Sequence, residues 1–380
     1  MRMQTAGTSD SRPREIAIVG TGGIAQIHAG DIARLADRAQ IVAAVDPDPA
    51  RLEPFASAWW VPRTYPDLAA MLEKERPDLV DLCTPPALHS AQAKICLERG
   101  LTVLCEKPPT LSLAELDDLA AAEAASAGRF AAVFQHRFGS GAQTLRHLVQ
   151  HGRLGVPTVA VCNTLWYRPD GHFSVPWRGT WEIEGGGPTL GYGIHQMDLM
   201  LSILGPWHQV TAVADRKARP TDTEDVSAAI VTFDNGAVAT VINSLLSPRE
   251  TSYLRFDFAD ATVELEHLYG YADADWSVTA VPGREDSVAA ALNEGPTGLP
   301  SGHAAQLSAV FDALDAGQAP PASLAEIRPT MELVTAIYAS AFTGRPVTAG
   351  EIGPGSPFYD RLDGTGAPWL TSSTPRENVT

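Results

Sequence analysis

Six residues near the amino terminus have the spacing of a phosphate-binding turn. They follow a short apolar run that predicts a strand, Glu15 to Val19, and they open a stretch that predicts a helix. In a turn of this kind, the first glycine permits the tight bend and the second lets the backbone approach a pyrophosphate. The amino end of the helix supplies free N–H groups for the anion. The six residues read G-x-G-x-x-A and are Gly20, Thr21, Gly22, Gly23, Ile24 and Ala25.

An acidic residue ends the second predicted strand, which is where dinucleotide-binding domains use one. Asp46 ends the second apolar run, Gln40 to Val45. Its carboxylate can accept hydrogen bonds from a ribose 2′-OH and would repel a 2′-phosphate. The pattern therefore predicts NAD(H) rather than NADP(H) as the cofactor.

Two more polar segments come directly after predicted strands, and ligands bind at such strand ends in open α/β sheets. A lysine held there near a cofactor is partly desolvated, which lowers its pKa and lets it donate or shuttle a proton. A cis bond is expected before Pro108, since X–Pro is the linkage that adopts it readily. The residues expected to contact the cofactor here are Thr84, Pro85, His89, Glu106 and Lys107.

The elements that position these residues alternate between strand and helix. Short continuous apolar strands separated by helix-length segments predict a parallel sheet covered on both faces, here over residues 14–138. After Phe138 longer strands follow one another, and Asn235-Gly236 between two of them is a hairpin signal. This predicts an α/β chain overall: a Rossmann domain, then an α+β domain over 139–349 with a large open, mostly antiparallel sheet. The segment 350–380 is rich in Pro and Gly and is expected to wrap the surface or to move.

The ordered set of motifs resembles the Gfo/Idh/MocA family of oxidoreductases, from about Glu15 to Val347. Beyond the segments above, the resemblance rests on Gly185, Gly186, Gly187, Gly193, His195 and Asp198. It implies an NAD(H)-dependent dehydrogenase or reductase acting on a CH–OH group. The substrate would be a sugar, a polyol or a related compound held between the two domains. The open sheet commonly mediates homodimers or homotetramers in this family.

The resemblance also implies roles for single residues. Lys107 would lie beside the nicotinamide and polarise the reacting oxygen, and His195 would be the main acid/base, with an ordinary pKa suited to neutral pH. Asp198 shares a helix face with His195 and is expected to orient it. The family usually has Asp four residues before this histidine, where this chain has Gly191. Either Lys107 and His195 suffice, or Tyr192 or another group substitutes, or the reaction differs.

A loop after the strand ending at Tyr167 is rich in aromatic and cationic residues. Aromatic faces stack on the C–H faces of sugar rings, while arginine binds hydroxyls or a carboxylate. We therefore expect substrate contacts here, with a packed subunit interface as the equal alternative. The candidates are Arg178, Trp166, Tyr167, Trp181 and His172, with Arg137 from the sixth strand end.

The composition excludes several classes of protein. The 380 residues include 28 basic and 45 acidic side chains, a formal net charge of −17, which disfavours nucleic acid and anionic membranes as partners. Met1 to Arg14 lacks an apolar core, so we expect no secretory signal and a cytoplasmic location. The four cysteines show no zinc or redox spacing, and His147 with His151 lacks a third ligand, so no metal is expected.

Two other functions stay open from the sequence. One is a redox-assisted glycosidase or lyase, which would use bound NAD transiently to acidify a neighbouring carbon. The other is a noncatalytic regulator that binds NAD(H), a reading supported only by Gly191.

Overall fold

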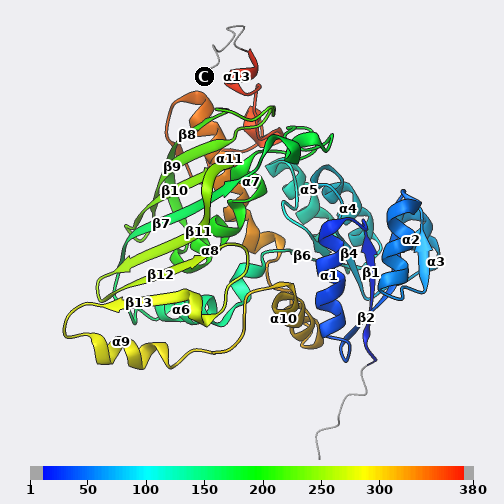
Figure 1. Ribbon diagram of the computed structural model, residues 1–380, viewed down its shortest axis with the longest axis horizontal. Helices are drawn as coiled ribbons and strands as arrows, with labels where there is room; N and C mark the ends of the chain where they lie inside the picture. The colour runs from blue at the N-terminus through cyan, green and yellow to red at the C-terminus, as the bar shows by residue number, and fades with distance from the viewer. Residues whose placement is uncertain (1–11, 372–380) are drawn as a thin grey trace, which may run out of the picture.

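In the computed structural model, which describes residues 12–371, the amino-terminal domain is a doubly wound α/β unit (Figure 1). Within those residues, its parallel sheet has the order β3-β2-β1-β4-β5-β6. The strands are β1 (Arg14–Val19), β2 (Ala39–Val45), β3 (Arg63–Tyr65), β4 (Leu79–Leu82), β5 (Thr102–Cys105) and β6 (Arg129–Ala132). The order reverses between β1 and β4, and ligands bind outside the carboxyl ends of the strands at such a point. The predicted Rossmann domain is confirmed.

The helices of this domain differ in how they begin. They are α1 (Gly23–Arg34), α2 (Pro49–Ala58), α3 (Leu68–Lys74), α4 (His89–Glu98) and α5 (Leu113–Ala124). The side chains of Asp48, Asp67 and Ser112 cap α2, α3 and α5. By contrast, α1 begins after Gly22 with no side-chain cap and no acidic residue in its first turn. Its first N–H groups therefore remain available to an anion.

The second domain is built on a mostly antiparallel sheet, as expected. Within the described part of the chain, the strand order is β13-β12-β11-β7-β10-β9-β8-β14, and only the β7–β10 pair is parallel. The strands are β7 (Pro157–Tyr167), β8 (Trp207–Asp215), β9 (Val226–Phe233), β10 (Val238–Ser244), β11 (Leu246–Phe258), β12 (Ala261–His267), β13 (Trp276–Ala280) and β14 (Val347–Thr348). The Asn235-Gly236 turn joins β9 to β10 as predicted, with Gly236 at φ +90°.

Helices cover one face of this sheet. They include α6 (Ser140–Gln150), α7 (Pro188–Gly191), α8 (Ile194–Leu204), α9 (Glu285–Leu292) and α11 (Leu324–Thr343). Buried along almost its whole length, α8 packs on β7 and β11 of the sheet and against α6 and α11. It thereby places Gly191 and Tyr192, at its amino end, toward the first domain.

The chain passes between the two domains more than once. Helix α10 (His303–Asp315) lies beside α1 (Figure 1), and its Leu307, Val310 and Phe311 belong to the apolar core of the Rossmann domain. Residues 303–315 therefore complete the first domain, although they fall in the 139–349 segment. None of the helices in residues 12–371 is both long enough and apolar enough to span a bilayer.

The described part of the expected tail, residues 350–371, packs onto the protein. It contains α12 (Pro357–Asp360) and α13 (Pro368–Thr371), and it buries Phe358, Leu362 and Trp369. The Trp369 indole N–H also donates to the carbonyl of Asp222. Residues 1–11, on which the expected absence of a signal largely rests, and 372–380 lie outside the described residues.

Candidate functional site

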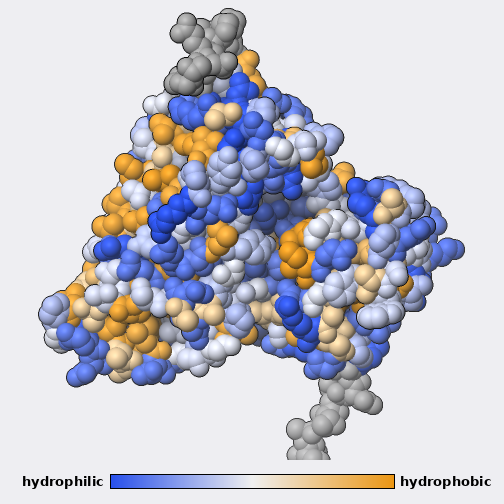
Figure 2. Space-filling view, in the orientation of Figure 1, coloured by the Kyte–Doolittle hydropathy of each residue, from blue (hydrophilic) through white to orange (hydrophobic). Residues whose placement is uncertain are grey.

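A cavity of about 790 Å³ lies at the carboxyl ends of β1, β2, β4 and β5 and extends to the second domain. Figure 2 shows the molecule hollowed between the two domains. The first domain contributes, among others, Gly20, Gly22, Gly23, Ile24, Asp46, Arg51, Cys83, Thr84, Pro85, Gln92, Glu106 and Lys107. The second contributes Arg168, His172, Trp177, Arg178, Glu184, Gly191, Tyr192 and Tyr269. One cavity thus joins most of the expected cofactor residues to part of the expected substrate loop.

The glycine turn fits a pyrophosphate. Gly20 has φ +87°, and a Cβ there would lie only 2.8 Å from the Cys83 carbonyl oxygen, so a side chain is excluded. A Cβ on Gly22 or Gly23 would meet no atom within 4 Å. Ala25 is fully buried, which lets α1 pack closely on the sheet. The turn therefore presents bare backbone and the uncapped start of α1 to the cavity, as a bound dinucleotide requires.

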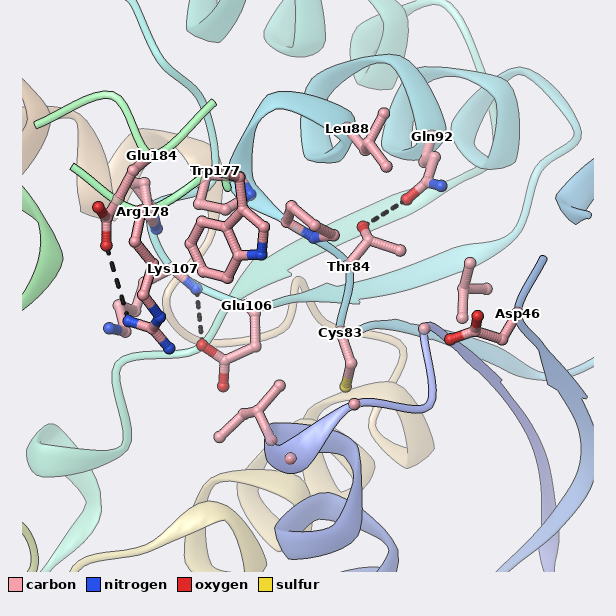
Figure 3. A pocket seen from close by; sticks show the side chains of 18 of the residues that line it. Asp46, Cys83, Thr84, Leu88, Gln92, Glu106, Lys107, Trp177, Arg178 and Glu184 are labelled. Carbon is pink, nitrogen blue, oxygen red and sulfur yellow. Dashed lines mark hydrogen bonds and ion pairs between the residues drawn. The ribbon is translucent and has the colours of Figure 1, made fainter. Parts of the chain in front are cut away.

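Asp46 lines the same end of the cavity as the glycine turn (Figure 3). Its Oδ2 accepts hydrogen bonds from the backbone and side chain of Thr21, and its Oδ1 accepts from the Asp48 N–H and from Arg51. Burial alone would raise the pKa of Asp46, but the bonds from Arg51 and Thr21 hold it below its ordinary value. Asp46 is therefore ionised at neutral pH. Arg51, which sequence reasoning missed, is half exposed and lies beside it.

The side chain of His89 contacts both of the segments that follow β4 and β5. Its Nδ1 lies 2.7 Å from the Pro108 carbonyl oxygen, and its Nε2 lies 2.7 Å from the Thr84 carbonyl oxygen. Burial lowers the pKa of His89. His89 does not line the cavity, so it positions the two segments instead of contacting a ligand, while Thr84 and Pro85 do line it.

Lys107 lies at the end of the cavity opposite Asp46 (Figure 3). The Lys107–Pro108 bond is cis, and the Lys107 Nζ donates to the Gly191 carbonyl at 2.7 Å. Burial lowers the pKa of Lys107, while Glu106 and Glu184 oppose the shift. This is the environment in which an ammonium group can both donate a hydrogen bond and give up a proton.

Glu106, His28 and Asp81 form a network of charged side chains next to Lys107. Glu106 accepts from the Lys107 backbone N–H at 3.0 Å, and its other oxygen lies 2.9 Å from Nε2 of His28. His28 Nδ1 lies 2.8 Å from Asp81, and both side chains are fully buried. Although burial alone would lower it, the pKa of His28 is raised well above its ordinary value by Asp81. An imidazolium ion held between two carboxylates therefore fixes Glu106 and the backbone that carries Lys107.

The expected acid/base, His195, is buried and does not line the cavity. Within residues 12–371, neither ring nitrogen has a hydrogen-bond partner. Its ring packs 5.0 Å from that of His136 and 6.2 Å from that of Tyr269. Burial, together with Lys107 and His136, holds the pKa of His195 well below its ordinary value. A neutral, shielded imidazole is thus placed behind the cavity wall.

Asp198 does not orient His195. Its carboxylate instead forms a two-pronged ion pair with Arg137, at 2.6 and 2.5 Å, and accepts from Thr330 at 3.0 Å. Arg137, expected to reach the cleft, is turned away from it for the same reason. The pair joins the segment after β6 to α8 and α11, which makes it a structural contact between the domains.

The aromatic residues expected at the substrate divide into two groups. Trp181 is buried in the core of the second domain, where its indole N–H donates to Asp222 and its ring packs on Tyr338. Tyr167 is exposed beneath Arg219, and Trp166 supports Arg168 from outside the cavity. These three residues do not line the cavity.

The loop residues that do line it form one polar cluster. His172 Nε2 lies 2.8 Å from Arg178 and 2.9 Å from the Tyr192 hydroxyl. Arg178 also lies over the ring of Trp177 and 3.9 Å from Glu184 (Figure 3). Sequence reasoning missed Trp177, Glu184 and Tyr269, although Trp177 belongs to the same aromatic and cationic loop.

Sequence comparisons agree with this geometry. Residues 14–134 match the family model described as an oxidoreductase family with an NAD-binding Rossmann fold, and residues 142–264 match the GFO/IDH/MocA C-terminal domain. The fold and the site thus define a dinucleotide-dependent oxidoreductase. The chain belongs to the GFO/IDH/MocA family, as its motifs indicated.

Several of the similar proteins are named as dehydrogenases of sugars. The chain is 28% identical over 292 residues to D-glucoside 3-dehydrogenase of Escherichia coli, covering 70% of this chain and 81% of that protein. It is 27% identical over 350 residues to D-apiose dehydrogenase of Paraburkholderia graminis, covering 87% and 88%. The solved WlbA dehydrogenase of Bordetella pertussis, in complex with NADH and UDP-GlcNAcA, matches with a TM-score of 0.79 at 25% identity, covering 89% and 99% of the two chains.

Proposed function

We propose that the chain transfers a hydride between NAD(H) and a secondary alcohol or ketone of a sugar, a polyol or a sugar derivative. One observation carries the proposal: a single cavity has the glycine turn and Asp46 at one end and Lys107 at the other. The names of the relatives, which act on a glucoside and on apiose, support a sugar-like substrate. When bound, the nicotinamide supplies the hydride donor or acceptor.

Lys107 is proposed to hold the reacting oxygen of the substrate. Its ammonium group is partly buried and, among the described residues, has one hydrogen bond, to Gly191. Two of its three N–H groups therefore remain for a ligand. The acid/base role assigned to His195 stays a prediction, since its nitrogens lack partners but the ring lies outside the cavity lining. Around Lys107, the ring of Trp177 and the guanidinium groups of Arg168 and Arg178 suit hydroxyls and a carboxylate.

Two alternatives from the sequence are less well supported. A noncatalytic regulator would not need Lys107 desolvated beside the cavity, and a redox-assisted glycosidase finds no counterpart among the dehydrogenase relatives named above. Incubating the protein with NAD⁺ and a panel of aldoses, aldonic acids and polyols tests the proposal. We expect NADH to accumulate together with an equal amount of oxidised product. Glycoside cleavage without NADH would favour the redox-assisted lyase.

Asp46 is proposed to select NAD(H). Asp46→Ser should raise kcat/KM with NADP relative to NAD by about tenfold or more, because it removes a repulsive carboxylate and frees Arg51 for a 2′-phosphate. Steady-state kinetics with both cofactors measure the ratio. Adding Arg51→Met to this variant should cancel the gain, and an unchanged ratio in Asp46→Ser alone would contradict the ribose role.

The open face of the second sheet is proposed to join copies of the chain into a homodimer or homotetramer. Exposed apolar side chains form a strip across β7, β8, β9 and β10, and Val213 is 67% exposed. The strip consists of Val159, Val213, Ile230, Val238 and Ile242. Ile230→Lys should lower the mass measured by light scattering from that of an oligomer to that of a monomer. A wild-type protein that is already monomeric at micromolar concentration would contradict this.

A cytoplasmic location is also proposed. All four cysteines are buried and unpaired, and burial raises the pKa of each thiol, to about 12 for Cys83 and Cys96. Such thiols are unreactive and suit a reducing compartment.

A further inference from the structure

The structure places a histidine and a tyrosine side by side on the wall of the cavity that Lys107 also lines. His172 belongs to the turn Asp170–Ser174 that follows β7, and Tyr192 lies between α7 and α8, directly after Gly191. The Tyr192 hydroxyl lies 2.9 Å from Nε2 of His172, and both residues line the cavity.

The neighbouring arginine fixes the direction of this hydrogen bond. Arg178 lies 2.8 Å from the same Nε2, and a guanidinium group has donors only. Nε2 must therefore be the acceptor and the His172 proton must be on Nδ1. It follows that the Tyr192 O–H donates to the same nitrogen, which it shares with Arg178. The Tyr192 oxygen, which also interacts with the Arg168 side chain, keeps one lone pair for a molecule in the cavity.

The electrostatics hold both groups in the forms that this bond requires. Burial, with Arg178 and Arg168, lowers the pKa of His172 to about 4. Burial raises the pKa of Tyr192. At neutral pH the pair is therefore a neutral imidazole and a neutral phenol. The charged groups around it are Arg168, whose guanidinium lies 5.2 Å from the centre of the Tyr192 ring, Arg178 and Glu184.

Lys107 and the pair line the same cavity. The Gly191 carbonyl accepts from Lys107 Nζ, and among the described residues a Cβ added to Gly191 would meet no atom within 4 Å apart from its chain neighbours and its own helix. An oxygen bound by Lys107 thus lies in the cavity whose wall carries the Tyr192 hydroxyl. His195 has no comparable access, because its nitrogens are buried and it does not line the cavity.

We propose that Tyr192 and His172 form the proton-transfer pair of the reaction, with Lys107 holding the substrate oxygen; this rests on the function proposed above. In oxidation, the substrate O–H bond breaks and its proton moves to the Tyr192 oxygen, while the phenol proton moves to His172 Nε2. The carbinol C–H bond breaks, its electron pair leaves as hydride for NAD⁺, and a C=O bond forms. Arg178 turns from Nε2 to Glu184 as the phenol proton arrives, which frees the Nε2 lone pair, and water then takes the proton from His172. Reduction reverses these transfers.

Tyr192→Phe and His172→Gln test the pair, with Tyr167→Phe as the matched control, since Tyr167 is in the same region but outside the cavity. Each of the first two should lower kcat at least 100-fold, with NADH affinity and melting temperature within error of wild type. Tyr167→Phe should turn over normally. Rates are measured for the substrate that the panel identifies.

Restoring a proton acceptor separates a chemical role from a structural one. Adding Gly191→Asp to Tyr192→Phe places a carboxylate in the open space beside Lys107 and should recover at least tenfold of the lost kcat, whereas a packing defect would not be repaired. Near-normal kcat in both Tyr192→Phe and His172→Gln, with turnover lost in His195→Ala, would overturn the proposal and return the proton transfer to His195. Absence of NADH-linked turnover in the wild type would instead overturn the proposed function itself.

Discussion

Replacing Lys107 with methionine is expected to lower kcat by roughly 10²–10⁴-fold while leaving NADH affinity nearly unchanged. Methionine keeps the length of the side chain but removes the ammonium group that donates to Gly191 and is proposed to hold the substrate oxygen. NADH affinity should persist because the glycine turn and Asp46 lie at the other end of the cavity (Figure 3). Turnover kinetics and a fluorescence titration of NADH measure the two effects separately.

Lys94→Met is the matched control, because Lys94 is an exposed residue of α4. It should leave both quantities unchanged. If Lys107→Met loses NADH affinity and turnover in equal proportion, Lys107 binds the cofactor and has no separate role in the chemistry.

Replacing His28 with leucine is expected to lower the free energy of unfolding by about 3–5 kcal/mol, because it leaves two buried carboxylates without their cation. Asp81 and Glu106 each lose a hydrogen bond of under 3 Å. Denaturant unfolding measures the loss. The same change at the exposed His147 should shift stability by at most about 0.5 kcal/mol; an equally small effect at His28 would mean that the network is not ionised.

The pH dependence of this network has a definite sign. His28 has a raised pKa in the folded protein, so its contribution is complete below its unfolded value near 6.5 and is lost as pH rises through the folded value. Burial alone would raise the pKa of Glu106, but His28 and His303 hold it well below its ordinary 4.5. Its contribution is therefore present above 4.5 and is lost as pH falls through the folded value. The gap between wild type and His28→Leu should be largest between these limits.

Local signals were sufficient to predict that the glycine turn, Asp46 and Lys107 would lie along one cavity. The glycine turn, Asp46 and Lys107 each follow a short strand directly, and a parallel sheet brings such strand ends together whatever the rest of the chain does. The fold class was also predictable from local patterns, because the period of the apolar residues changes from one domain to the next. The sequence also showed that Gly191 stands where the family usually has Asp, and the structure shows open space at that position.

The substrate end depends on contacts between distant segments, which single-sequence patterns do not encode. Asp198 lies three residues after His195 but pairs with Arg137, which comes from the other domain. Trp181 is of a residue type that is common in sugar-binding loops, yet its side chain is buried in the core of the second domain. Likewise, nothing in the local pattern around His303 shows that α10 packs against α1.

Transfer of deuterium from NADH labelled at nicotinamide C4 tests the central claim most directly. With a keto sugar as acceptor, mass spectrometry should find one deuterium in the alcohol product and one equivalent of NAD⁺ formed. Lys107→Met should give far less of both. An unlabelled product with the cofactor unchanged, or a cleaved glycoside in place of a reduced sugar, would contradict hydride transfer between the cofactor and the substrate.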